Sequence, residues 1–180
     1  MSTMKVLICQ EIKNLVWEVR ERPVPGDNEA LIKIKTVGIC GTDIHAWAGN
    51  QPFFSYPRVL GHEICGEIIE SGKNIHNFNI GQQVAVIPYI SCQQCPACKS
   101  GRTNCCEKIS AIGVHQDGGF SEYLSVPVAN ILPADGIDPQ AAALIEPFAI
   151  SAHAVRRAAI APGEQVLVGG ANRSGRGGNR

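Results

Sequence analysis

The sequence lacks a net charge, because 16 Lys and Arg residues balance 16 Asp and Glu residues in a chain of 180. An excess of basic residues is the usual electrostatic signature of proteins that bind nucleic acid or anionic membranes. We therefore expect neither nucleic acid nor a membrane among the partners. Hydrophobic residues make up 44% and charged residues 18%, which is an ordinary composition for a folded globular protein.

Long apolar runs are also missing from the chain. Residues 1–10 contain one Lys and a short apolar run at 6–9, so they do not resemble a secretory signal. A membrane-spanning helix needs about 18 consecutive apolar residues, and Glu146 and Pro147 interrupt the most apolar stretch. These features predict a cytoplasmic protein.

The first part of the chain has the pattern of a β protein. Short apolar or alternating segments are separated by turn signals rich in Gly, Pro, Asn and Asp, and such regular spacing is typical of an antiparallel barrel or sandwich. The predicted strands cover residues 6–9, 15–19, 30–35, 64–70, 83–87 and 120–126.

The character of the sequence changes near Asp138. Asp138 and Pro139 form an N-cap followed by Pro at the first helical position, which predicts a helix over 140–145. Pro147 starts a second helical pattern that Pro162 and Gly163 end, and residues 165–168 have the composition of a buried strand. Helix, turn, strand and glycine in this order predict the beginning of a parallel α/β domain.

A cluster of cysteines predicts a metal site. Four thiols lie within 15 residues in the spacing C-x2-C-x2-C-x7-C, at Cys92, Cys95, Cys98 and Cys106. Four thiolates suit tetrahedral zinc, and a closed set leaves no position for substrate, so we expect a structural zinc here. Cys105 could replace Cys106, although we favour Cys106. Iron in a rubredoxin-like site and a nucleic-acid-binding zinc ribbon are the alternatives, but a ribbon separates its two knuckles further.

A second set of metal-binding residue types is spread over separate segments. Cys40, His62, Glu63 and Glu146 lie in the runs 38–45, 61–63 and 145–147. One Cys, one His and one Glu would supply the three protein ligands of a catalytic zinc and leave one position open. The spacing of these residues does not by itself show that they converge.

Five motifs together resemble a known family. V-G-I-C-G-T-D-I-H, G-H-E, the four-cysteine lobe, G-G-F-S-E-Y and L-I-E-P occur in the order seen in zinc-dependent medium-chain alcohol and polyol dehydrogenases. The resemblance covers residues 4–168 and is strongest to the sorbitol dehydrogenase branch. It implies a GroES-like barrel followed by a Rossmann domain, NAD as cofactor, a small sugar acid or polyol as substrate, and a homo-oligomer.

The resemblance also implies roles for individual residues. Cys40 and His62 match two catalytic zinc ligands, Glu146 occupies the third position, and Glu63 approaches the same zinc as an alternate or outer carboxylate. Cys92, Cys95, Cys98 and Cys106 match the structural zinc lobe, within residues 91–107. Thr42 and His45 match the proton relay. Zinc is therefore expected at two sites, one catalytic and one structural.

The sequence departs from the family after Val168. Gly169 to Arg180 contains five Gly, three Arg and two Asn and no large apolar residue, and it does not form the Gly-x-Gly-x-x-Gly turn that binds a dinucleotide. We expect a GroES-like domain over 1–145, the start of an incomplete Rossmann domain over 146–168 and a disordered tail over 169–180. A frame shift or a misplaced gene end would explain the tail. A non-catalytic zinc-binding fragment is therefore the alternative to an active dehydrogenase.

Overall fold

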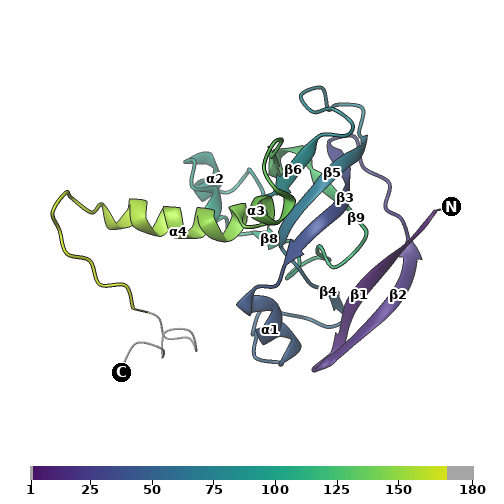
Figure 1. Cartoon of the computed structure of the whole chain (residues 1–180), viewed down its shortest axis with the longest axis horizontal. Helices are drawn as coiled ribbons and strands as arrows, with labels where there is room; N and C mark the ends of the chain where they lie inside the picture. The colour runs from purple at the N-terminus through teal and green to yellow at the C-terminus, as the bar shows by residue number, and fades with distance from the viewer. Residues whose placement is uncertain (1, 170–180) are drawn as a thin grey trace. The chain divides into compact units, whose positions relative to one another are not determined.

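The computed structural model describes residues 2–169 and contains mostly β-structure (Figure 1). The strands are β1 (Thr3–Glu11), β2 (Asn14–Glu21), β3 (Glu29–Gly38), β4 (Arg58–Val59), β5 (Glu63–Ser71), β6 (Gln83–Val86), β7 (Tyr89–Ile90), β8 (Ser110–Ala111), β9 (Tyr123–Pro127) and β10 (Ile131–Pro133). The helices are α1 (Gly41–Trp47), α2 (Pro96–Lys99), α3 (Pro139–Ala143) and α4 (Ile145–Ala158), with 3₁₀ turns at Thr103–Cys105 and Val128–Asn130. The chain divides into two compact units, Met1–Phe148 and Ala149–Arg180.

The larger sheet forms the core of the first unit. Its strand order is β10-β6-β5-β3-β9, and all neighbours are antiparallel. The sequence of β3 predicts that Ala30, Ile32 and Ile34 face the core and that Leu31, Lys33 and Lys35 face solvent. This alternation is present only from Ile32 onward, where Lys33 and Lys35 are exposed, because Leu31 is fully buried like Ala30 and Ile32. The buried cluster over this sheet contains mainly β-branched residues, among them Ile64, Ile68, Val84 and Val126. Such side chains favour strands because they pack well on a pleated surface.

A smaller sheet has the order β2-β1-β4 and joins the larger one. Val6 forms an antiparallel bridge with Ser121, and the N–H of Leu7 donates a hydrogen bond of 2.7 Å to the carbonyl of Phe120. Val6 and Ile8 are buried against Val59, whereas β2 is largely exposed. The segment predicted as a strand at 120–126 therefore begins as a link between sheets and pairs as β9 only from Tyr123.

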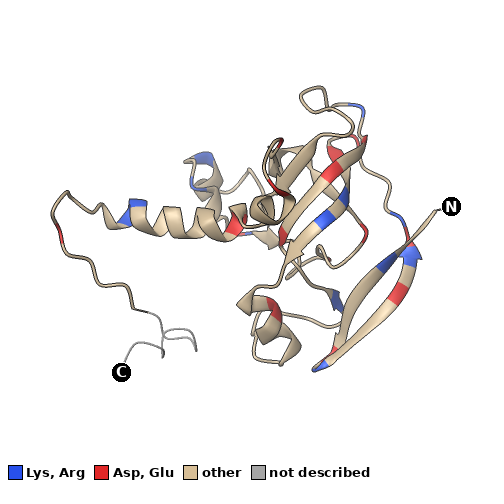
Figure 2. Ribbon diagram, in the orientation of Figure 1, with Lys and Arg blue, Asp and Glu red and all other residues tan. Residues whose placement is uncertain are grey.

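The helical predictions are confirmed in part. Asp138 caps α3 by accepting hydrogen bonds from the N–H groups of Gln140 (2.9 Å) and Ala141 (3.2 Å), with Pro139 in the first turn. The next helix, α4, carries Glu146 in its first turn and Arg156 and Arg157 in its last, which complements the helix dipole (Figure 2). It ends at Ala158, before the expected stop at Pro162, because Ala159 has a positive φ of 49°.

Two predictions about local structure were wrong or incomplete. Residues 165–168 form no strand, and Leu167 is 95% exposed, because a strand exists only through pairing and no partner lies within residues 2–169. Helix α1 was not predicted. The expected disorder of 169–180 concerns residues outside the described range, apart from Gly169. No helix in the described part of the chain is long and apolar enough to span a bilayer.

Candidate metal centres

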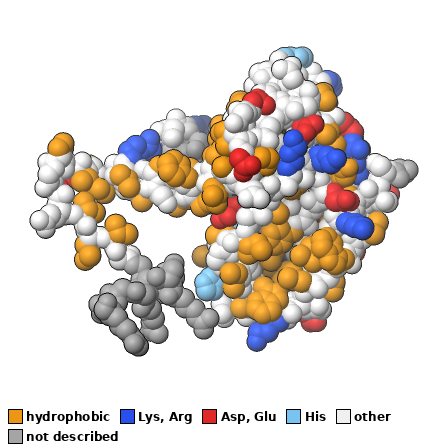
Figure 3. All heavy atoms as spheres, viewed as in Figure 1, with side chains coloured by type: hydrophobic (Ala, Val, Ile, Leu, Met, Phe, Trp, Pro, Cys, Tyr) orange, Lys and Arg blue, Asp and Glu red, His pale blue; other side chains and the backbone are white. Residues whose placement is uncertain are grey.

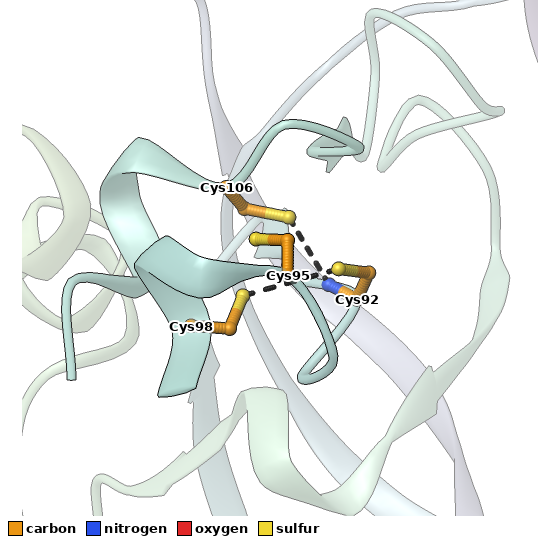
Figure 4. Close-up of side chains that lie close together, drawn as sticks. All are labelled: Cys92, Cys95, Cys98 and Cys106. Atoms are coloured by element: carbon orange, nitrogen blue, oxygen red, sulfur yellow. Dashed lines mark hydrogen bonds between the residues drawn. The ribbon is translucent and has the colours of Figure 1, made fainter. Parts of the chain in front are cut away.

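Four cysteine sulfurs converge in the lobe that follows β7 (Figure 4). The sulfurs of Cys92, Cys95, Cys98 and Cys106 all lie within 4.8 Å of one another, and Cys92 Sγ is 4.0 Å from Cys98 Sγ. Tetrahedral zinc with bonds of about 2.3 Å requires sulfurs about 3.8 Å apart. The four thiols therefore stand close to the spacing of a zinc site, and the chemistry of the donor set fits zinc.

Short turns in the backbone aim these sulfurs inward. Cys95 precedes α2 with Pro96 in the first turn, so Cys98 comes around the same turn. Cys106 follows the 3₁₀ turn, and its sulfur accepts N–H bonds from Cys92 (3.2 Å) and Lys108 (3.3 Å).

The pKa values of the lobe thiols reflect this arrangement. Hydrogen bonds from the N–H groups of Gln94 and Cys95 lower the pKa of Cys92 to about 6. Burial raises the pKa of Cys98 to about 12, and the neighbouring Cys95 and Cys106 sulfurs add to the rise. Thiolates this close repel one another, so a divalent cation among them would offset the repulsion.

Cys105 lies outside this cluster. Cys105 is exposed, whereas Cys106 is only 6% exposed and its sulfur lies close to the sulfurs of the other three cysteines. The structure thus places Cys106, rather than its neighbour, in the fourth position. The two remaining core cysteines, Cys9 and Cys65, are fully buried in apolar clusters as small hydrophobic residues.

A second cluster forms where β3, α1 and β5 meet. Ligand atoms of Cys40, His62 and Glu63 lie within 4.8 Å of one another. Cys40 is the N-cap of α1, while His62 precedes β5 and Glu63 begins it. His62 and Glu63 are each 7% exposed. The half-buried thiol of Cys40 and the buried imidazole and carboxylate match the donor set of a three-ligand zinc site.

Asp43 connects the two segments that carry this cluster. Its carboxylate is 3% exposed and accepts hydrogen bonds from the N–H groups of Cys40 (2.8 Å) and Gly61 (3.0 Å). One side chain thereby fixes the start of α1 and the chain just before His62. The sequence analysis did not assign this role to Asp43, although its position three residues after Cys40 is the spacing of a capping box.

Two glycines allow the close approach. Gly38 stands opposite Glu63 in the β3–β5 ladder, and a Cβ on Gly38 would lie 2.0 Å from Glu63 Oε2. Gly61 has a φ of 93°, a left-handed conformation that other residues rarely adopt, and it turns the chain from β4 toward β5. Glycine is therefore needed at position 38 to leave room for Glu63, and at position 61 to allow the turn that leads to His62.

The imidazole of His62 has no hydrogen-bond partner at Nδ1. This atom is buried and lies 3.6 Å from Asp43 Oδ1, which is too long for a hydrogen bond. Burial alone lowers the pKa of His62, but the Asp43 carboxylate and then the Cys40 sulfur favour the imidazolium and raise the pKa to about 9. Histidine ligands commonly direct one nitrogen to a metal and the other to a carboxylate, and here the Asp43 carboxylate lies near Nδ1.

Glu146 lies beside the second cluster but is not part of it. Its Oε1 accepts a hydrogen bond of 2.8 Å from the Tyr89 hydroxyl. Burial, this hydrogen bond and the negative charges of Glu146 and Cys40 all raise the pKa of Tyr89. Tyr89 therefore holds Glu146 and is also near enough to Cys40 to be influenced by its charge, a role that no local motif indicates.

The two predicted relay residues, Thr42 and His45, lie on α1. Thr42 and His45 are three residues apart on α1, so they share one side of the helix, and His45 is exposed. Trp47 lines an apolar cavity of about 320 Å³ with Ile39 and Ile44, and no residue of the second cluster lines it. Phe53 is 75% exposed.

Comparison with known proteins adds the family context. The alcohol dehydrogenase GroES-like domain matches residues 26–136, which confirms the expected GroES-like fold. The chain is 85% identical to L-galactonate-5-dehydrogenase of Escherichia coli (strain K12), over 98% of this chain and 52% of that protein. It is 37% identical to L-threonine 3-dehydrogenase of Shewanella sp. (strain W3-18-1), over 93% of this chain and 50% of that protein.

Solved structures show the same fold. The alcohol dehydrogenase RspB of E. coli CFT073, in complex with NADH, has a TM-score of 0.89 at 38% identity, over 97% of this chain and 51% of that chain. Galactitol-1-phosphate dehydrogenase of E. coli has a TM-score of 0.78 at 31% identity, over 87% of this chain and 45% of that chain. The chain spans about half the length of the curated relatives it matches.

Proposed function

This chain belongs to the zinc-type medium-chain alcohol dehydrogenase family. We therefore propose that it acts as a zinc-dependent oxidoreductase, which oxidises a secondary alcohol and transfers the hydride to NAD. The substrate class we propose is a sugar acid or polyol. L-galactonate, oxidised at C5, is the specific substrate we propose, and the 85% identity to L-galactonate-5-dehydrogenase supports it. The observation that carries the proposal is the convergence of Cys40, His62 and Glu63.

These three side chains have the charges that a zinc ion requires. The Cys40 thiolate and the Glu63 carboxylate would offset the two positive charges of the metal, and neutral His62 would complete the set. A bound zinc would supply Lewis-acid chemistry that lowers the pKa of the substrate hydroxyl. Three protein ligands leave one position for that hydroxyl oxygen. The closed four-thiol lobe offers no such position, so we assign it a structural zinc.

Residues of α1 would carry the proton away. The Thr42 hydroxyl can accept a proton from the substrate and donate its own, because it is both donor and acceptor. His45 lies one turn further along the same helix and is exposed, so it can exchange the proton with water. Asp43 lies on the buried side between them and positions Cys40 instead.

We assign the third ligand position to Glu63 in the arrangement seen here. Glu63 belongs to the cluster, whereas Tyr89 holds Glu146 by a hydrogen bond of 2.8 Å. Glu146 would then be a carboxylate that can exchange with Glu63 when Tyr89 releases it. The sequence motif had favoured the opposite order.

The remaining parts of the proposal concern the whole protein. We propose a GroES-like domain over residues 1–145, with residues 146–168 starting a Rossmann domain that binds NAD, a homo-oligomeric state and a cytoplasmic location. We propose no nucleic-acid and no membrane partner. The alternative is a non-catalytic zinc-binding GroES-like fragment.

A combined zinc and activity experiment separates the two possibilities. The chain is loaded with zinc, its metal content is measured, and NADH formation is followed with L-galactonate and with other sugar acids and polyols. NADH formation that Cys40→Ala abolishes while the lobe zinc remains would support the dehydrogenase. Two bound zinc ions without NAD binding by calorimetry would support the fragment. A Cys40→Ala variant that keeps both zinc ions would refute the catalytic site.

A further inference from the structure

The backbone around Tyr89 is fixed by three hydrogen bonds from other segments. The side-chain amide of Asn130 is buried and donates to the carbonyls of Ile87 (2.8 Å) and Tyr89 (3.1 Å). The N–H of Ile112 donates to the carbonyl of Pro88 between them (2.9 Å), and β7 pairs with β8 at this point. Three consecutive carbonyls are thus held in place, so the phenol of Tyr89 extends from a fixed position.

The Tyr89 phenol contacts a carboxylate that could bind the same metal. Its hydroxyl donates a hydrogen bond of 2.8 Å to Glu146 Oε1, and Tyr89 is near enough to Cys40 to be influenced by its charge. Within residues 2–169 the Glu146 side chain makes no other hydrogen bond and no ion pair. Tyr89 is therefore the group that holds this carboxylate.

The two carboxylates near the second cluster are held in different ways. Glu63 is 7% exposed and lies on β5 opposite Gly38, so its backbone belongs to the sheet. Glu146 is half-buried in the first turn of α4, and Figure 3 shows acidic side chains at the surface around α3 and the start of α4. The hydrogen bond from Tyr89, rather than burial, therefore restrains the Glu146 side chain.

We propose that Tyr89 is a positioning residue that keeps Glu146 off the metal of the second site and so keeps the fourth coordination position free for substrate. This inference rests on the zinc site of Cys40, His62 and Glu63 proposed above. Three protein ligands leave a zinc ion open to substrate, whereas four close it as in a structural site. Binding of Glu146 would also bring a third negative charge to a divalent ion. The Tyr89 hydroxyl thus decides whether the site is open or closed.

Chelator competition on the zinc-loaded chain measures the first effect. Tyr89→Phe removes only the hydroxyl, so Glu146 can join the metal without first breaking its hydrogen bond, and the zinc affinity of the second site should rise about tenfold. The rise should disappear when Glu146→Ala is added. Tyr123→Phe is the matched control, because it removes a phenol hydroxyl from β9, which carries no residue of either cluster. Zinc in the four-thiol lobe should stay unchanged in every variant and so reports that the chain is folded.

A suppressor variant gives the second test. Glu63→Gln removes one ligand charge and should weaken zinc binding at the second site. Adding Tyr89→Phe should restore most of this affinity, because the released Glu146 can supply the missing carboxylate. A substitution that merely loosened the fold would weaken binding further. Restoration of zinc affinity therefore separates a positioning role of Tyr89 from a structural one.

Cobalt(II) gives a spectroscopic test of the open position. Cobalt replaces zinc in both sites, the Cys40→Ala variant supplies the spectrum of the lobe alone, and azide is the probe that binds at the fourth position and shifts the visible bands. Azide should bind to Tyr89→Phe about tenfold more weakly than to the unchanged chain. The factor matches the one expected for metal affinity, because both report how often Glu146 fills this position.

The outcomes distinguish this inference from the proposed function. Equal zinc affinities in the unchanged chain and in Tyr89→Phe, with the second site filled in both, would overturn the role of Tyr89 and leave the metal centre standing. A rise that persists after Glu146→Ala is added would also overturn it, since the effect would not pass through Glu146. Failure of Tyr89→Phe to restore Glu63→Gln would count equally against it. An unchanged chain that binds no zinc at the second site would overturn both the inference and the proposed function.

Discussion

Removing the Asp43 carboxylate should both destabilise the fold and weaken the second metal site. In Asp43→Ala the N–H groups of Cys40 and Gly61 lose their acceptor. The Gly61 bond is buried, so its N–H should cost about 1–3 kcal/mol when left unpaired, while water can partly replace the acceptor for the less buried Cys40 N–H, at about 1 kcal/mol. We therefore expect the free energy of unfolding to fall by about 2–4 kcal/mol.

The matched control is Asp138→Ala. Asp138 also accepts two backbone N–H bonds, but it is an exposed helix cap, and the loss of such a cap costs about 1 kcal/mol. Urea denaturation of zinc-loaded protein measures both changes. Asp43→Asn keeps one acceptor oxygen, so its free energy of unfolding should lie between those of the unchanged chain and Asp43→Ala.

The metal readout separates positioning from general stability. Asp43 faces His62, and loss of such an outer partner typically lowers metal affinity by about 10–100-fold. Competition with a chromophoric chelator should show this loss at the second site only, with the four-thiol lobe unchanged. If Asp43→Ala destabilises the chain no more than Asp138→Ala and binds two zinc ions with unchanged affinity, the reasoning about Asp43 is wrong.

Three further outcomes are expected. The Cys95→Ser variant should lose the lobe zinc during dialysis, because it lacks one of the four clustered thiols. The Cys105→Ser variant should keep this zinc, because Cys105 is exposed and lies outside the cluster. Equal zinc retention by the two variants would contradict the assignment of the lobe. Gly38→Ala should weaken zinc binding at the second site, because its Cβ would lie 2.0 Å from Glu63 Oε2. Gly41→Ala is the control, since a Cβ there would meet no atom within 4 Å and should leave the affinity unchanged. Chelator competition measures both affinities, and equal values would refute the steric argument. In zinc-free protein the pKa of His62 is raised from 6.5 to about 9. Its contribution to the free energy of unfolding should therefore be complete below pH 6.5 and lost as the pH rises through 9. Denaturation at several pH values should show this fall for the unchanged chain but not for His62→Gln.

The sequence could predict those features that depend on neighbours along the chain. Asp138 and Pro139 start α3 because capping involves residues two and three positions away. The lobe follows the same logic, since its four thiols lie within 15 residues and short turns bring them together. The alternation in β3 likewise identifies the face that carries Ile32, although it does not predict that Leu31 on the other face is also buried.

Features that depend on tertiary contacts could not be predicted in this way. The proposed choice of Glu63 over Glu146 as zinc ligand depends on the ladder that sets Gly38 opposite Glu63 and on the hydroxyl of Tyr89, both distant in sequence. Helix α1 has only seven residues and contains the β-branched Thr42 and Ile44, so its periodicity is too short to detect. Residues 165–168 have strand composition, but composition cannot supply a neighbouring strand.

The different chain distances within the two metal sites imply an order of assembly. The lobe closes loops of only a few residues, so its thiols can gather around an ion while the rest of the chain is still unfolded. The second site requires residues 40 and 63 to lie close together, and this depends on the pairing of β3 with β5 as far as Gly38. Metal capture at the proposed lobe site would thus be a local event, whereas occupation of the proposed second site would require the β3–β5 pairing to extend as far as Gly38.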